Sequence, residues 1–187
     1  MITLSPAENV PQRVRDAIDQ ANALLSGEEL YTIIRERPTR FDKSTPDTLM
    51  PPEVATAFQN LTETFTVLMD HFGKPSTTGA YTCSRNATTR RTVRVSDRPN
   101  HVDNPMPVLV ATLIHECVHA LDCFTPTFRI RHGDNGRPGN GETAPYWIGD
   151  QAGALIEASE GLVATPFTYE VEVEYQDEPV KVDSVEE

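Results

Sequence analysis

Two histidines one helical turn apart are the residues of this 187-residue chain whose types and spacing indicate chemistry. The stretch His115-Glu116-Cys117-Val118-His119 has the pattern H-E-x-x-H. On a helix, residues four apart lie on one face, so both imidazoles can reach one metal ion. Zinc accepts neutral imidazole nitrogens, and a catalytic zinc site keeps three protein ligands and one water molecule. The pattern therefore predicts a zinc site whose third protein ligand lies elsewhere in the chain.

Glu116 follows the first histidine and is expected to act on that water molecule. Zinc lowers the pKa of a bound water, and a nearby carboxylate can accept its proton. The residues around the motif are strongly apolar, so the helix would bury polar side chains that need partners. A metal ion supplies that partner. The alternative, in which the two histidines lie on an exposed helix face and bind nothing, fits the apolar surroundings less well. The sequence thus predicts hydrolysis with Glu116 as the general base.

The third zinc ligand has several candidates after the motif. His132 lies in a glycine-rich loop, and Glu142 comes just before a predicted helix. His132 has the ligand type, whereas Glu142 has the firmer position because a helix start is more rigid than a loop. Asp150 and Glu157 are further candidates on that helix. Residue types and spacing alone leave the choice between His132 and Glu142 open.

Several other residues near the motif have distinct expected roles. Asp122, three residues beyond His119, suits the orientation of a histidine ligand. Tyr146 could donate a hydrogen bond to a developing oxyanion, and Cys117 points away from the ligand face as a small core residue. Two further histidines have no partner at a metal-binding spacing and are expected at surface or capping positions: His71 and His101.

Helices are expected to position these residues. Apolar residues recur at spacings of three and four in four segments of the chain. The segment that carries H-E-x-x-H is apolar nearly all round, which predicts a helix buried in the centre of the domain. The predicted helices cover residues 11–25, 52–72, 105–124 (or from 107) and 145–160.

Short strands are expected to complete the fold. The sequence predicts two strands joined by a turn, at residues 79–83 and 91–96. Apolar and polar residues alternate over residues 167–175, which predicts an amphipathic strand with one acidic face. Residues 30–34 fit a strand or a helix, and the four prolines within residues 37–52 indicate a loop. The predicted fold class is α+β, with helices around a small antiparallel sheet. We expect one domain over residues 1–165 and an acidic C-terminal strand and tail over residues 166–187.

The charge of the chain limits its partners. The formal net charge is −12, and eight acidic residues with one lysine follow Tyr169. This excludes a basic field over the whole protein for nucleic-acid binding. A local cluster of arginines still allows a weak contact with nucleic acid: Arg85, Arg90, Arg91 and Arg94.

The composition predicts an intracellular protein, cytoplasmic or nuclear. No run of 18 apolar residues indicates a membrane span, and the first residues have no basic segment followed by an apolar one, as a secretory signal would. The three cysteines are too few and too irregular for a disulfide framework, which favours a reducing compartment: Cys83, Cys117 and Cys123.

Three stretches, in this order, resemble the core of the SprT-like (Spartan-type) zinc metalloproteases. They are T-T-G-A-Y-T-C at residues 77–83, R-T-V-R-V-S at 91–96 and A-T-L-I-H-E-C-V-H-A at 111–120. The resemblance covers residues 58–120, and H-E-x-x-H is its most specific part. It implies a zincin-like metallopeptidase fold, a zinc endopeptidase activity and a protein or peptide substrate.

The same resemblance implies a third histidine ligand in a G-H-G-like turn before another helix. Arg131-His132-Gly133-Asp134 partly matches that turn, which favours His132. Gly139-Asn140-Gly141-Glu142 occupies the place of the family's G-x-G-H, so that a histidine-to-glutamate exchange would make Glu142 the ligand. Proteases of this family act on proteins crosslinked to DNA and often carry DNA-binding modules, and no such module is visible in this sequence.

Two other functions fit the same residues. The chain could be an effector or toxin-type zinc metalloprotease of another zincin lineage, with Glu142 as the third ligand. It could also be a non-catalytic interaction module in which zinc is structural and the acidic strand recruits a partner. A fourth protein ligand that closes the zinc site would indicate the last of these.

Overall fold

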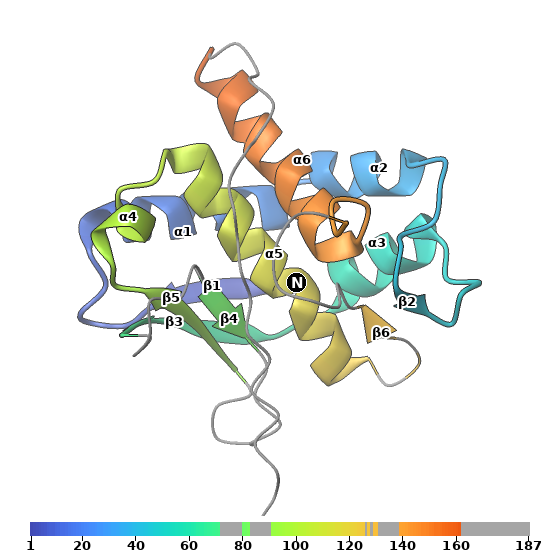
Figure 1. The fold of residues 1–187 in the computed structure, drawn as a ribbon, viewed down its shortest axis with the longest axis horizontal. Helices are drawn as coiled ribbons and strands as arrows, with labels where there is room; N and C mark the ends of the chain where they lie inside the picture. Colours follow the sequence, from blue (N-terminus) through green and yellow to red (C-terminus); the bar gives the residue numbers. More distant parts are fainter. Residues whose placement is uncertain (72–79, 83–90, 126, 128, 131–138, 162–187) are drawn as a thin grey trace, which may run out of the picture.

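A long helix, α5 (Met106–Phe124), runs through the middle of the molecule in the computed structural model (Figure 1). The structure describes residues 1–71, 80–82, 91–125, 127, 129–130 and 139–161. Every residue of α5 from Pro107 to Leu121 is buried. This confirms the prediction that the helix carrying H-E-x-x-H is central and buried. His132 and the expected strand at residues 167–175 lie outside the described residues.

The described part of the chain forms a mixed α+β fold, as the sequence predicts. Its helices and strands are interspersed along the chain, which begins with a strand and ends, in the described part, with a helix that packs on α5. In chain order the other elements are β1 (Thr3–Pro6), α1 (Gln12–Ser26), α2 (Glu29–Glu36), β2 (Ser44–Thr45), α3 (Pro51–Asn60), β3 (Thr64–Asp70), β4 (Ala80–Thr82), β5 (Thr92–Ser96), α4 (Pro99–Val102), β6 (Arg129–Ile130) and α6 (Ala144–Ser159).

The main sheet has four strands in the order β1-β3-β5-β4. β3 runs parallel to β1 and to β5, and β4 runs antiparallel to β5. The predicted pairing of the strands near residues 79–83 and 91–96 is therefore confirmed. The predicted antiparallel sheet is wrong, because two of the three strand pairs are parallel. β4, at the edge of this sheet, contacts α5.

The error in the sheet comes from the helix predicted over residues 52–72. In the structure α3 ends at Asn60, and β3 begins at Thr64. Along β3, exposed and buried residues alternate, with Phe65 and Val67 both fully buried. Threonine at every second position favours an extended chain, and this two-residue period competes with the three-to-four spacing of the apolar residues. Strand β1, which β3 joins to the sheet, was not predicted at all.

The other helices follow their apolar periodicity. α1, α5 and α6 lie within two residues of the predicted ranges 11–25, 105–124 and 145–160. The ambiguous segment at residues 30–34 is helical and belongs to α2. The proline-rich segment at residues 37–52 is mostly loop, but it contains β2, which pairs with β6 in a small antiparallel sheet.

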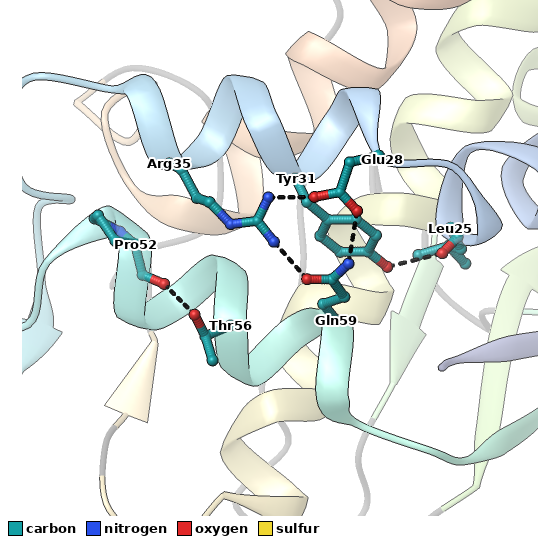
Figure 2. A network of polar contacts seen from close by, with 7 residues as sticks. All are labelled: Leu25, Glu28, Tyr31, Arg35, Pro52, Thr56 and Gln59. Atoms are coloured by element: carbon teal, nitrogen blue, oxygen red, sulfur yellow. Dashed lines mark hydrogen bonds and ion pairs between the residues drawn. The ribbon is translucent and has the colours of Figure 1, made fainter.

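A ring of polar contacts joins α2 to α3 (Figure 2). Arg35 donates to Glu28 and to Gln59, and the amide nitrogen of Gln59 donates to the second oxygen of Glu28 at 2.8 Å. Beneath this ring, the buried hydroxyl of Tyr31 donates to the carbonyl of Leu25 at 2.9 Å. The ion pair is exposed to solvent and is screened by it, whereas the hydrogen bond of Tyr31 is buried.

The cysteines differ from the prediction. Cys117 is a buried free thiol, and Cys123 is disulfide-bonded. Cys83 lies outside the described residues. The expectation of a reducing compartment rests on unpaired cysteines, and Cys123 does not meet it.

α5 is also long and apolar enough to cross a membrane by length and composition. Other elements of the fold cover it: 83% of the apolar stretch of this helix is buried. A lipid-facing helix would expose its apolar side chains instead. The burial is therefore that of a core helix.

Gly149 allows α6 to pack closely on α5. A Cβ atom at this position would lie 2.8 Å from the carbonyl oxygen of Ala111 and 3.4 Å from the Cβ of His115. The first of these distances is shorter than any normal contact, and a backbone carbonyl cannot rotate away. The glycine is therefore required for the distance between the two helices.

We expect Gly149→Ala to lower the free energy of unfolding by about 1–3 kcal/mol, measured by chemical denaturation. Overpacking against the carbonyl outweighs the roughly 1 kcal/mol that alanine gains in helix propensity. Gly141→Ala is the matched control, because no atom lies within 4 Å of the added Cβ. Its effect should stay within about 0.5 kcal/mol. Equal stability of the two variants would contradict the close packing.

Candidate metal centre

The two histidines of the motif converge on one point of α5. The Nε2 atoms of His115 and His119 lie 3.1 Å apart, and their ring centroids are 4.8 Å apart. Both residues are buried, with exposed fractions of 3% and 2%. Two nitrogen ligands at ~2.0–2.1 Å from a tetrahedral zinc lie about 3.3 Å apart. The observed separation therefore fits a shared metal ion.

The same separation is that of a hydrogen bond between the two rings when no metal is bound. One Nε2 would carry the proton and donate it, and the other would accept. This arrangement needs both imidazoles to be neutral or only one to be charged. Neutral imidazole is also the form that binds a metal ion.

Glu116 and Cys117, the two residues after His115, are both fully buried. Burial raises the pKa of the Cys117 thiol, and the nearby Glu116 carboxylate raises it further. Cys117 therefore stays protonated at neutral pH and belongs to the hydrophobic core, as predicted.

Two residues of α6 pack against His115. The ring of Tyr146 stands edge-on to the imidazole, with centroids 4.6 Å apart and an interplanar angle of 86°. Gly149, one turn later, leaves room for the Cβ of His115. Tyr146 is 1% exposed, so its ring lies within the protein interior.

The structure brings together two of the predicted ligands and leaves the third undetermined. Among the described residues, no group of three His, Cys, Asp or Glu side chains could hold a metal ion. Glu142, Asp150 and Glu157 thus do not join the histidine pair in such a group. His132, the other candidate, lies outside the described residues.

Glu142 has a different partner. Its carboxylate accepts a hydrogen bond from the guanidinium of Arg37 at 2.7 Å, and its side chain is 66% exposed. The Arg37 side chain is only 4% exposed. Its guanidinium carbon lies 4.7 Å from the ring centroids of both Phe41 and Trp147. Arg37 is thus held by two aromatic faces as well as by the carboxylate.

Further contacts tie the loop after α2 to the start of α6. The backbone N–H of Asp42 donates to the carbonyl of Glu142 at 3.0 Å. Lys43 Nζ donates to Asn140 Oδ1 at 2.5 Å, and the hydroxyl of Thr143 donates to the carbonyl of Asn140 at 2.6 Å. We call these contacts, together with Arg37 and Glu142, the Arg37 clamp. The clamp fixes the first turn of α6, which carries Tyr146.

Asp122 binds the backbone of β6. Its Oδ1 accepts a hydrogen bond from the N–H of Ile130. The contact joins α5 to the strand that precedes residues 131–138, the segment that contains His132. The role expected from the sequence, the orientation of a histidine ligand, stays a prediction.

The remaining histidines and arginines of interest lie apart from the pair. His71 is exposed, as expected, and lies 3.1 Å from Asp97, whereas His101 is in the last turn of α4 and is buried rather than at the surface. Burial and the positive charge of Arg98 lower the pKa of His101. In the arginine cluster, Arg91 pairs with Glu63 at 2.6 Å and Arg94 with Asp70 at 2.8 Å, while Arg85 and Arg90 lie outside the described residues.

Sequence reasoning missed Arg37 and Gly149. A single arginine before a proline-rich loop has no pattern that marks it, because its partner Glu142 is far away in the chain. A glycine inside a helical pattern does carry a signal, since it weakens the helix and usually has a packing reason. Gly149 could have been found in this way.

Comparison of the chain with protein families, with curated proteins and with solved structures finds no match. The candidate site is therefore interpreted from its own geometry and chemistry.

The Arg37 clamp leads to an asymmetric stability prediction. We expect Arg37→Lys to lower the free energy of unfolding by about 1–3 kcal/mol, since lysine can neither stack between two rings nor donate as a planar fork. Glu142→Gln should cost less than about 1 kcal/mol, because its carboxylate is 66% exposed. Chemical denaturation of both variants checks this. A larger loss for the glutamine variant would contradict the clamp as described.

Proposed function

We propose that this protein is a zinc-dependent metallopeptidase that hydrolyses peptide bonds, with Glu116 as the general base. The observation that supports this is the convergence of the two Nε2 atoms, 3.1 Å apart, on a buried helix. The adjacent carboxylate of Glu116 is buried on the same helix. Burying two imidazoles and a carboxylate lowers the stability of the fold, because these groups lose their contact with water. Such groups are found together at the active sites of hydrolases.

The residues present fit the metal ion that the motif implies. His115 and His119 would hold zinc through Nε2, and a third ligand would come from His132 or, in the alternative, from Glu142. Bound zinc would supply Lewis acidity, which polarises a carbonyl group and lowers the pKa of water. Three protein ligands would leave one position for water or substrate.

Glu116 would move the proton in the reaction. Its carboxylate would accept a proton from the attacking water and later deliver it to the nitrogen of the leaving amine. The carboxylate is fully buried, which limits the access of bulk water to the proton that it would carry. Glu116 follows His115 directly on α5, and its carboxylate is buried in the same section of the helix as the histidine pair.

The resemblance to SprT-like proteases supports a zincin-like fold and a protein or peptide substrate. The α+β class and the central helix agree with this proposal at a coarse level. A contact with nucleic acid through the arginine cluster would be weak, since Arg91 and Arg94 are already paired with carboxylates of the same sheet. Arg85 and Arg90 would have to supply it.

Two alternatives use the same histidine pair. An effector or toxin-type metalloprotease of another zincin lineage would take Glu142 as third ligand, which requires the carboxylate to leave Arg37. A zinc-stabilised interaction module would need a fourth protein ligand in place of water. Glu116 favours an enzyme over such a module, since structural zinc gains nothing from a buried carboxylate beside its ligands.

Glu116→Gln should separate zinc binding from hydrolysis. We expect the variant to bind zinc as the wild type does and to lose about 10²–10⁴-fold in peptide cleavage, because the amide cannot accept the proton. Metal analysis and a peptide-library cleavage assay measure the two quantities. Glu157→Gln is the matched control, a buried glutamate of α6 that should leave both unchanged. Retained cleavage by Glu116→Gln would refute the general-base role.

The third ligand can be identified by replacing the two candidates separately. We expect His132→Ala to weaken zinc binding by at least about 100-fold, and Glu142→Ala to leave it nearly unchanged, because Arg37 already engages that carboxylate. Zinc affinity is measured by competition with a chelator. The reverse result would support the other zincin lineage, and loss in neither variant would exclude both candidates.

A further inference from the structure

His115 is held from the side of α6 by two residues. The ring of Tyr146 meets the imidazole edge-on at 4.6 Å, and Gly149 lets the backbones approach so that His115 fits beneath α6. The Cβ of His115 would lie only 3.4 Å from a Cβ built at Gly149. The imidazole therefore packs against the Tyr146 ring, while Gly149 lies close to the Cβ of His115.

Convergence of the two Nε2 atoms needs one orientation of each imidazole. A histidine side chain on a helix can rotate about two bonds, and most of its rotamers point Nε2 elsewhere. An edge-to-face contact between rings adds about 0.5–1.5 kcal/mol to simple burial and depends on the angle between them. The Tyr146 ring thus favours the orientation in which the Nε2 of His115 faces that of His119.

The geometry points to Tyr146 as the positioning residue of the metal centre. Its ring holds the His115 imidazole ready for the metal ion, and it acts through His115 rather than on the substrate. The inference rests on the proposed function for the identity of the site. It differs from the oxyanion role considered for Tyr146, which would depend on the hydroxyl group and not on the ring.

Tyr146 itself has rigid support. It lies in the first turn of α6, where the backbone N–H of Trp147 donates to the carbonyl of Thr143 at 2.9 Å. The Arg37 clamp fixes the loop directly before this turn. Positioning groups of this kind work when packing locks their own rotamers. The chain of contacts runs from the clamp through the first turn of α6 to His115.

Metal binding by three proteins tests the inference: the wild type, Tyr146→Phe and Tyr146→Leu. Zinc affinity is measured by chelator competition, and cobalt(II) added to the metal-free protein reports the ligand geometry through its visible absorption. We expect Tyr146→Leu to weaken zinc binding by about 10–100-fold and to alter the cobalt spectrum. Tyr146→Phe keeps the ring and should match the wild type in both.

Tyr31→Leu is the matched control. Tyr31 is the other fully buried tyrosine of the described residues, and it lies on α2 with its hydroxyl bound to Leu25. We expect this variant to lose stability without any change in zinc affinity or cobalt spectrum. Tyr146→Met, with a flexible apolar side chain, provides a second test in case the leucine variant does not fold.

Several outcomes would overturn the inference. Wild-type affinity in Tyr146→Leu or Tyr146→Met would show that the ring does not position His115. Equal losses in Tyr146→Phe and Tyr146→Leu would assign the role to the hydroxyl. A wild type that binds no zinc would refute the proposed function as well. A wild type that binds zinc but cleaves no peptide would refute the enzyme and leave the positioning role intact.

Discussion

The burial of two imidazoles and a carboxylate within an apolar helix is the constraint on which the rest of the structure depends. α5 must exclude water along its whole middle section, so the sheet edge, α1, α3 and α6 all pack against it. Polar groups in such a place are tolerated only when other groups or ions compensate them. The two Nε2 atoms, 3.1 Å apart, are compensated by each other without a metal ion and by a shared ion with one.

Several contacts hold the neighbouring elements firmly against α5. α6 approaches closely at Gly149, and the Arg37 clamp holds the start of α6 to the loop after α2. Asp122 holds β6 to the end of α5. These contacts fix the histidine pair and its surroundings, and the two candidates for a third ligand of the proposed zinc site, His132 and Glu142, both lie between β6 and α6 in the chain. The half of the proposed site that α5 carries is thus preorganised by packing.

The sequence predicts the parts of this protein that depend on local order. The motif at residues 115–119 lies within about one turn of a helix. The apolar periodicity that predicts α1, α5 and α6 likewise lies within short stretches of the sequence. Short strands fail for the opposite reason: β1 and β6 exist only because distant strands pair with them. The segment of β3 satisfies two periods at once, and its place between β1 and β5 decides between them. The Arg37–Glu142 pair joins residues 105 positions apart, which no local pattern contains.

The position of Glu116 favours the proposed catalytic site over a structural one. On a helix the residue after a ligand points about 100° away from it, so Glu116 cannot replace His115 or His119 as a ligand of the same ion. A structural zinc site would lose nothing if this position held alanine or leucine, and the fold would avoid the desolvation of a carboxylate. The buried carboxylate is thus a cost to stability that the helix carries beside its metal-binding face. Such a cost is expected where a proton must be moved and is unexplained where an ion only holds the chain together.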